Sequence, residues 1–211
     1  METLFDFVRK QPTKRFERHE TIIQLDTVPQ AIYAVRTGFV KGFDITTSGQ
    51  EQLVWLGGPN DVFPVGWLFD IIERTQFIYS AFSDCEVHII MKDDFLQFLQ
   101  NNNEGTLELA RQMSQRYYEL MERIRALEQP KASDKIAHTI YFLAQHFSLK
   151  DTERRTEIPL PLTHQDMANL LGLTRETVAV ELKRLKDAKL VYYDKWHFVV
   201  FTDAMHEYLQ Q

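Results

Sequence analysis

Between residues 16 and 91 the chain alternates short apolar stretches with glycine-containing turns. The apolar stretches recur at a spacing of roughly ten residues, as short strands do in all-β domains. They lie at residues 21–23, 31–35, 40–45 and 52–56, and the turn-forming segments between them are 37–38, 47–50 and 57–61. This pattern is typical of an antiparallel sandwich or barrel. It predicts an all-β domain in the front half of the chain.

Beyond Lys92 the apolar spacing becomes helical. Asp93 can cap a short helix that runs to Gln100. After three asparagines, apolar residues recur at alternating steps of four and three, which is a coiled-coil seam over about three heptads. The seam positions that we assign to dimerisation are Ala110, Met113, Tyr117, Leu120, Ile124 and Leu127.

Two kinds of partner can cover this seam. The helix either lies on the core of its own domain or pairs with the same helix of a second chain. Self-pairing is favoured, because a helix this long buries its stripe more easily against a copy of itself. Pro130 then ends the helix, and Ser133 or Asp134 can cap a further helix that runs to about Phe147. Residues 129–132 are the natural hinge.

A helix-turn-helix pattern follows in the back half. Thr163, with Asp166 three residues later, is a capping signature for a first helix. Ala168 is small where a second helix must cross closely, and Gly172 stands where the chain must turn with a positive φ. Thr174 can cap the second helix. The residues that this second helix is expected to bury are Val178, Leu182 and Leu185.

The first turn of this second helix is polar, which distinguishes it from an ordinary helical hairpin. Arg175 and Glu176 point outward where a recognition helix meets base edges, and Thr174 and Thr177 flank them. Downstream, further cations can face the phosphate backbone. These cations are Lys183, Arg184, Lys186 and Lys189. The pattern favours DNA binding.

Two apolar runs around a polar pair follow the second helix. Residues 190–193 and 196–201 flank Asp194-Lys195, which predicts a hairpin with a tight turn, as in the wing of a winged helix. Lys195 at the tip of this wing can touch a phosphate. Residues 158–162 also alternate between apolar and other positions, so they can pair as a short extra strand.

Composition narrows the class of protein. The 211 residues, 44% of them apolar, suffice for packed cores and exclude intrinsic disorder. No apolar run approaches the ~18 residues that a membrane helix needs, and the first residues do not resemble a secretory signal. We therefore expect a cytoplasmic protein with no membrane partner.

Charge is unevenly distributed along the chain. Residues 1–130 hold 13 Lys and Arg against 19 Asp and Glu, whereas residues 131–211 hold 11 of each. The net charge of −6 therefore lies in the front part, and only the neutral back part can approach a polyanion comfortably. This split supports two domains.

Enzyme chemistry and a bound metal are not expected. A metalloenzyme on a β-roll needs clustered His and Glu ligands, but His19 and His88 are the only two histidines before residue 131. The chain shows no nucleophile motif and no phosphate-cradling glycine loop. The single cysteine, Cys85, cannot build a four-cysteine iron–sulfur cluster. We interpret all three residues as ordinary strand or turn residues and expect no cofactor.

The succession of these elements resembles the Crp/Fnr family of bacterial transcription regulators, the family of the cAMP receptor protein. The most specific segments are 160–163 and 174–178, together with Ala168 and Gly172, and segments 19–23, 32–41 and 56–63 also resemble the family. The resemblance implies an α+β fold with three parts. These are an N-terminal antiparallel β-roll of the cyclic-nucleotide-binding, jelly-roll type (1–102), a dimerisation helix with hinge (103–130) and a winged helix-turn-helix domain (131–211).

The resemblance also implies partners and residue roles. A homodimer would bind a near-palindromic operator in double-stranded DNA, with two recognition helices in successive major grooves about 34 Å apart, and would contact RNA polymerase. Arg175 matches the family arginine that reads guanine, and Glu176 matches the glutamate that accepts from cytosine. The positions that match the family's phosphate anchors are Thr163, His164, Gln165, Thr174 and Thr177.

One position departs from the family pattern. A second guanine-reading arginine commonly stands five residues after the first, and here Val180 occupies that place. Valine offers only apolar contact, for instance to a thymine methyl group. We therefore expect a half-site that differs from the usual family sequence.

The front half lacks the cyclic-nucleotide signature. In the cAMP-binding branch a glutamate holds the ribose and an arginine holds the cyclic phosphate, but here Trp67 and Thr75 fall at these positions, with Arg74 one residue away. A phosphate buried without a charge partner is costly. The effector stays unknown. The aromatic residues expected to fill the sensor core, rather than to line an apolar pocket, are Trp55, Phe63, Trp67, Phe69, Phe77, Tyr79 and Phe82.

The sequence thus predicts a homodimeric, sequence-specific transcription regulator that does not respond to cAMP. Two alternatives stay open. One is a protein-interaction module with a degenerate DNA-binding domain, given the sequence pI of about 5.7 and the missing arginine. The other is a regulator that does respond to a cyclic nucleotide, for which Arg74 would have to shift by one position.

Overall fold

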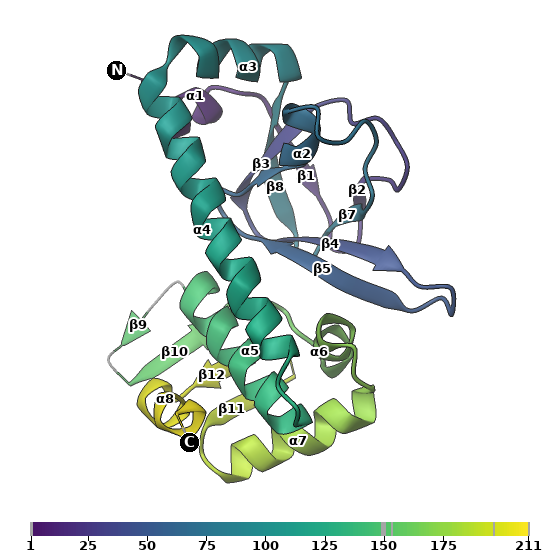
Figure 1. Ribbon diagram of the computed structural model, residues 1–211, viewed down its shortest axis with the longest axis vertical. Helices are drawn as coiled ribbons and strands as arrows, with labels where there is room; N and C mark the ends of the chain where they lie inside the picture. The colour runs from purple at the N-terminus through teal and green to yellow at the C-terminus, as the bar shows by residue number, and fades with distance from the viewer. Residues whose placement is uncertain (1, 149–150, 153, 196, 211) are drawn as a thin grey trace. The chain divides into compact units, whose positions relative to one another are not determined.

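The computed structural model describes residues 2–148, 151–152, 154–195 and 197–210. Its internal contacts divide the chain into two compact units, residues 1–116 and 117–211. The division falls inside the longest helix, α4 (Asn103–Leu127), so each unit holds part of this helix (Figure 1).

The first unit is built on two four-stranded antiparallel sheets. Their strand orders are β1-β8-β3-β6 and β2-β7-β4-β5. The strands are β1 (Thr13–Phe16), β2 (Thr21–Ile23), β3 (Ile32–Thr37), β4 (Val40–Ile45), β5 (Glu51–Gly57), β6 (Val62–Phe63), β7 (Ile78–Ala81) and β8 (Cys85–Ile90). Buried side chains from both sheets form one core, including Phe16, Val40 and Val87. The all-β prediction for this region is confirmed.

Three short helices and the start of α4 complete this unit. They are α1 (Leu4–Arg9), α2 (Val65–Leu68) and α3 (Lys92–Asn101). A second core joins Leu4 and Val8 of α1 with Ala34, Phe95 and Leu109. The face of β3 that carries Ala34 is therefore covered by helices, as amphipathic elements require in a layered fold.

Two predicted helix caps are wrong. Asp93 lies inside the first turn of α3, which begins at Lys92 after Met91 and has no side-chain cap. The helix after the hinge, α5 (Ala132–Phe147), begins after Lys131, so Ser133 and Asp134 also lie within its first turn. A carboxylate in a first turn still stabilises the positive end of the helix dipole, which explains why acids stand there without capping.

The second unit combines helices with a four-stranded sheet. The helices after α5 are α6 (His164–Leu171), α7 (Arg175–Asp187) and α8 (Thr202–Leu209), and the strands are β9 (Asp151–Thr152), β10 (Arg155–Ile158), β11 (Val191–Asp194) and β12 (His197–Val200). The sheet order is β11-β12-β10-β9, all antiparallel. The β11–β12 hairpin is the expected wing, although Trp196 lies outside the described residues.

The extra strand is shifted from its predicted place. Strand β10 runs over Arg155–Ile158 and pairs with β12, whereas residues 160–162 are not in a strand. Pro159 and Pro161 have no backbone N–H to donate to a ladder, so the strand cannot continue through them. Within the described residues, no helix is both long and apolar enough to span a bilayer.

Candidate nucleic-acid interface

Both helices of the helix-turn-helix begin with the side-chain caps that the sequence predicts. The Thr163 hydroxyl accepts from the N–H of Asp166, and the Asp166 carboxylate accepts in turn from the N–H of Thr163. Thr174 accepts from the N–H of Thr177 at 3.1 Å. These bonds satisfy N–H groups that a helix end leaves open. They also fix where α6 and α7 begin.

The turn between the two helices depends on Gly172. This residue ends α6 in the left-handed conformation, at φ 64° and ψ 33°. The N–H of Leu173 then donates to the carbonyl oxygen of Ala168 at 3.1 Å. A glycine adopts positive φ without the steric penalty of a Cβ atom. The predicted sharp turn is confirmed.

Helix α7 buries one face and exposes the start of the other. Val178, Leu182 and Leu185 are buried, as the helical spacing predicts. Arg175 and Glu176 at its first turn are exposed, and neither forms an ion pair in the described part of the chain. Val180 is 52% exposed. The side chains expected to read bases are therefore accessible.

His164 lies half-buried at the start of α6. Its ring meets the Tyr193 ring edge-on at 5.5 Å, and Tyr193 stacks on Phe198. Burial, helped by the nearby charge of Arg175, lowers the pKa of His164. The imidazole is thus neutral near pH 7, so it can offer a hydrogen bond but no full charge to a phosphate. No spacing or motif in the sequence predicted this contact with the wing.

The remaining predicted DNA contacts are also on the surface. Gln165, Lys183 and Lys195 are exposed, and Thr163 and Thr177 are half-buried. The Gln165 amide donates to Asn169 Oδ1 at 2.8 Å. Lys195 occupies the wing tip with φ 50°. None of these residues is buried in the protein.

One of the predicted phosphate-facing cations, Lys186, makes contacts within the protein. Lys186 lies over the rings of Tyr192 and Tyr193 at 4.9 and 4.8 Å and donates to the Tyr193 carbonyl oxygen. These contacts tie the end of α7 to the first wing strand. Sequence reasoning grouped this lysine with the phosphate-facing cations and missed the supporting contact.

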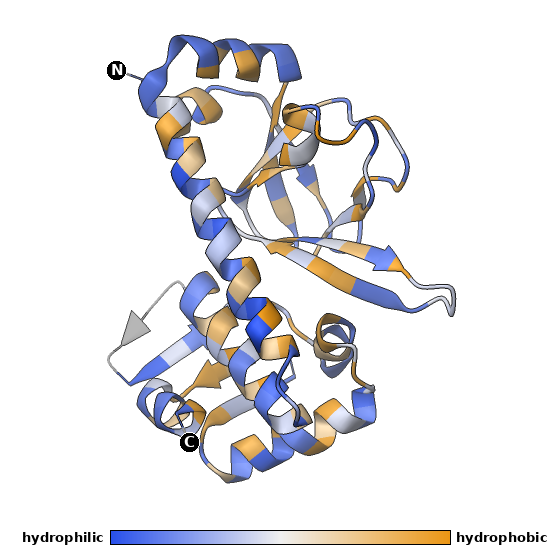
Figure 2. Ribbon diagram, viewed as in Figure 1, coloured by the Kyte–Doolittle hydropathy of each residue, from blue (hydrophilic) through white to orange (hydrophobic). Residues whose placement is uncertain are grey.

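The predicted seam of α4 is mixed in its burial. Met113 packs against the core of the first unit, so at this position the helix lies on its own domain. By contrast, Tyr117, Leu120 and Ile124 are 62%, 51% and 54% exposed. Both colours of the hydropathy scale recur along this helix in Figure 2. Exposed apolar side chains at this spacing form a surface that a second helix can cover.

The interior of the β-roll is occupied by its own aromatic side chains. The Phe63 ring lies 5.5, 5.3 and 5.1 Å from the rings of Tyr33, Trp55 and Tyr79. Burial raises the pKa of Tyr79 to about 12. Of the aromatic residues expected to fill this core, Trp55, Phe63 and Tyr79 pack here, and Phe82 is buried. Two others do not belong to it: Trp67 packs against the second core, which contains Leu4 and Val8, and Phe69 is 45% exposed.

Thr75 and Arg74 are both engaged outside this interior. The Thr75 hydroxyl donates to the Gln24 carbonyl oxygen at 2.7 Å, and the Arg74 guanidinium donates to the Asp26 carbonyl oxygen at 2.8 Å. Both therefore hold the loop between β2 and β3. Cys85 is buried, and burial raises the pKa of its thiol to about 11, so it behaves as a small apolar residue.

Two family models match the chain, one in each part. Residues 134–205 match the Crp-like helix-turn-helix domain, and residues 13–102 match the cyclic nucleotide-binding domain. The chain belongs to the Crp/Fnr family. Members of this family are DNA-binding transcription regulators rather than enzymes. The β-roll, the long helix and the helix-turn-helix of this chain are the parts of the family's fold.

Relatives and solved structures agree with this assignment. The anaerobic regulatory protein of Haemophilus influenzae is 29% identical over 185 residues, which are 84% of this chain and 67% of the relative. The fumarate and nitrate reduction regulatory protein of Escherichia coli is 28% identical over 203 residues, 93% of this chain and 77% of the relative.

Among solved structures, FixK2 from Bradyrhizobium japonicum superposes with a TM-score of 0.77 at 18% identity, covering 93% of this chain and 96% of the other. TTHB099 from Thermus thermophilus, a CRP-family transcriptional regulator, gives 0.75 at 18% identity, covering 94% and 97%. At 18% identity, these superpositions support the fold of the chain and nothing further.

Proposed function

We propose that this chain is a homodimeric regulator that binds a near-palindromic operator and does not respond to cAMP. The observation that carries the proposal is the exposed polar start of α7, where Arg175 and Glu176 stand clear of the protein on a capped, rigid helix. The same end of the helix has a positive partial charge, which favours nearby phosphates. Arg175 would donate to guanine, and Glu176 would accept from cytosine N4.

Dimerisation is supported by the exposed apolar stripe of α4. A lone chain would leave Tyr117, Leu120 and Ile124 in water, whereas a second copy of the helix would cover them in a coiled-coil seam. Two-fold symmetry would then present two recognition helices to two half-sites of one operator. By its similarity to the Crp/Fnr family, we also propose that the protein acts in the cytoplasm and contacts RNA polymerase.

Val180 gives the proposed operator its distinguishing feature. Its exposed side chain follows Arg175 by five residues and offers methyl groups only, so it would favour a thymine methyl over a guanine edge at that position. The half-site would therefore differ from that of a regulator with arginine there.

Insensitivity to cAMP is supported by the sensor unit. Thr75 and Arg74 hold a neighbouring loop, and the roll interior is packed with aromatic rings. At the positions that carry the cyclic-nucleotide signature, Thr75 is uncharged and Arg74 is bonded to the Asp26 carbonyl oxygen, so neither offers a free charge to a cyclic phosphate, and burying a phosphate unpaired is costly.

Selection from random duplex DNA, followed by gel shifts over a salt series, tests the proposal. We expect a two-fold symmetric site, one dimer per site, and an affinity that falls steeply with salt because phosphate contacts release counterions. The Val180→Arg variant should shift the selected base at one position of each half-site towards guanine. If no sequence is enriched and binding to every duplex is negligible, the chain is instead a protein-interaction module.

A further inference from the structure

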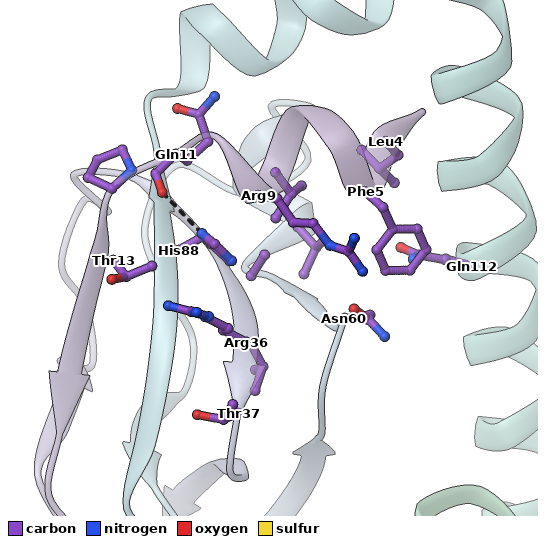
Figure 3. Close-up of a pocket in the computed structure, with 15 residues that line it drawn as sticks. Leu4, Phe5, Arg9, Gln11, Thr13, Arg36, Thr37, Asn60, His88 and Gln112 are labelled. Atoms are coloured by element: carbon purple, nitrogen blue, oxygen red, sulfur yellow. Dashed lines mark hydrogen bonds between the residues drawn. The ribbon is translucent and has the colours of Figure 1, made fainter. Parts of the chain in front are cut away.

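A cavity of about 660 Å³ lies in the first unit, on the face of sheet β1-β8-β3-β6 that also carries α1. Its walls come from α1, from strands β1, β3 and β8, and from α4 (Figure 3). Small-molecule sites in proteins have volumes of roughly 300 to 1,000 Å³. Among the described residues, the aromatic rings that pack between the two sheets (Tyr33, Trp55, Phe63 and Tyr79) do not line this cavity.

The charged groups that line the cavity are cationic. Arg9 and Arg36 are among the lining residues, and no Asp or Glu lines the cavity in the described part of the chain. Arg36 pairs with Glu86 at 3.1 Å, so its charge is partly compensated. Arg9 has no ion pair with any described residue. The cavity therefore favours an anion over a cation.

Two side-chain amides extend the set of available hydrogen-bonding groups. Asn60, before β6, and Gln112, on α4, both line the cavity. Within the described residues, neither side-chain amide has a hydrogen-bond partner. Each can donate two N–H groups to an oxygen atom of a bound molecule.

His88 contributes a buried group with one ring nitrogen left over. The residue is 6% exposed, and its Nδ1 lies 3.1 Å from the Gln11 carbonyl oxygen. A carbonyl oxygen can only accept, so Nδ1 carries a proton, and in the neutral tautomer that this fixes Nε2 is an acceptor. No described residue hydrogen-bonds to Nε2. Figure 3 shows the ring among the labelled polar side chains that line the cavity.

Apolar side chains form part of the remaining wall, together with Gln11, Thr13 and Thr37. Phe5, Leu4 and Val8 of α1 and Val62 of β6 line the cavity beside the polar groups. An apolar wall with a few placed polar groups is the usual make-up of a site for a small organic molecule. Such a wall favours a ligand with a compact hydrocarbon body over a bare inorganic ion.

We propose that this cavity binds a small hydroxy-substituted organic acid. Its carboxylate accepts hydrogen bonds from the Arg9 guanidinium and from the free amides, its hydroxyl donates to Nε2 of His88, and its hydrocarbon body lies against Phe5 and the aliphatic wall. This binding does not depend on the proposed DNA recognition.

Titration calorimetry on the full chain tests the proposal with three matched probes. They are 3-hydroxybenzoate, benzoate (no hydroxyl) and 3-hydroxybenzamide (no charge). We expect 3-hydroxybenzoate to bind, benzoate to bind about fivefold more weakly through loss of one hydrogen bond, and the amide to bind at least about tenfold more weakly. If 3-hydroxybenzoate does not bind, or if the amide binds equally well, the proposal is wrong.

Variants assign the effect to this cavity. Arg9→Gln should abolish the preference for carboxylate over amide. Lys10→Gln should leave it unchanged, because Lys10 pairs with Glu2 and does not line the cavity. His88→Phe should abolish only the preference for the hydroxylated acid. Because His88 is buried, thermal denaturation checks that the His88→Phe variant is folded. If this variant does not fold, the comparison of Arg9→Gln with Lys10→Gln decides the outcome. An unchanged carboxylate preference in Arg9→Gln would place the binding elsewhere.

Discussion

Arg175 combines three properties that a base-reading residue needs. It is exposed, it has no ion pair within the described part of the chain, and it stands in the first turn of a helix whose start is fixed by the Thr174 cap. A guanidinium that already paired with a carboxylate of its own chain would have to break that pair before binding guanine. Arg175 has no ion pair to break within the described residues, so it can bind guanine directly.

The Arg175→Ala variant should lose about 1–3 kcal/mol of binding free energy on the selected operator and little on random duplexes, because a bidentate contact to guanine discriminates between bases. Lys195→Ala is the matched comparison. Its loss of one phosphate contact at the wing tip should weaken both duplexes alike and reduce the salt slope by about one. Gel shifts on both duplexes measure the difference. Equal losses for Arg175→Ala on the two duplexes would reduce its role to phosphate contact.

Local physical chemistry explains which single residues were predictable from the sequence. Thr163, Asp166 and Gly172 act within their own turn of chain, so spacing alone identified them. Asp93 and Ser133 offered the same chemical groups but lie one or two residues inside their helices. Which of several adjacent residues becomes the cap depends on how the helix packs, and spacing does not contain that information.

The elements themselves followed largely from periodicity. The strands at 21–23 and 40–45 coincide with the predicted apolar stretches, because a half-buried strand has apolar residues alternating with polar ones. The missing strand at residues 160–162 and the split burial of α4 were harder to predict. The burial of α4 depends on partners distant in the sequence, as Met113 shows by packing on the core of its own unit. The strand stops for a local reason, because Pro159 and Pro161 have no backbone N–H. The cavity beside α1 was not predictable, since it joins residues from Leu4 to Gln112.

The turn between α6 and α7 can be tested as an element. A Cβ atom added at Gly172 meets no heavy atom within 4 Å, so only backbone strain opposes substitution. Gly172→Ala should therefore lower the free energy of unfolding by about 1–2 kcal/mol. Gly172→Asn should lower it less, because asparagine tolerates the left-handed region. Chemical denaturation compares the two. Equal stability of the alanine variant and the parent would contradict the strain argument.

The exposed stripe of α4 makes a second prediction at this scale. Leu120→Glu places like charges at the proposed two-fold contact, which costs several kcal/mol and raises the dimer dissociation constant on the order of a thousandfold. Gln115→Glu adds the same charge at an exposed position on the opposite side of the helix and should leave the dimer intact. Light scattering and operator binding report both effects. A Leu120→Glu protein that stays dimeric and binds its operator would exclude this seam.

On the scale of the whole molecule, sensing and DNA binding are linked by free energy. An effector can change operator affinity only if it binds one functional state better than another. The sensor unit can therefore change operator affinity through the small molecule that it binds. Its roll interior is filled by Tyr33, Trp55, Phe63 and Tyr79, whereas the cavity beside α1 offers unpaired polar groups.

This contrast predicts the response of the intact protein to cyclic nucleotides. Saturating 3′,5′-cAMP should leave operator affinity and its salt dependence unchanged, because Thr75 and Arg74, at the position of the family's phosphate-binding arginine, are bonded to the loop between β2 and β3 and offer no free charge to a buried cyclic phosphate. Gel shifts with and without cAMP measure the response, and equilibrium dialysis measures binding directly. A Crp/Fnr regulator that carries the complete cAMP signature is the positive control. Tighter operator binding with cAMP would mean that the Arg74 loop rearranges to supply the missing charge, and the chain would then be a cyclic-nucleotide-responsive member of its family.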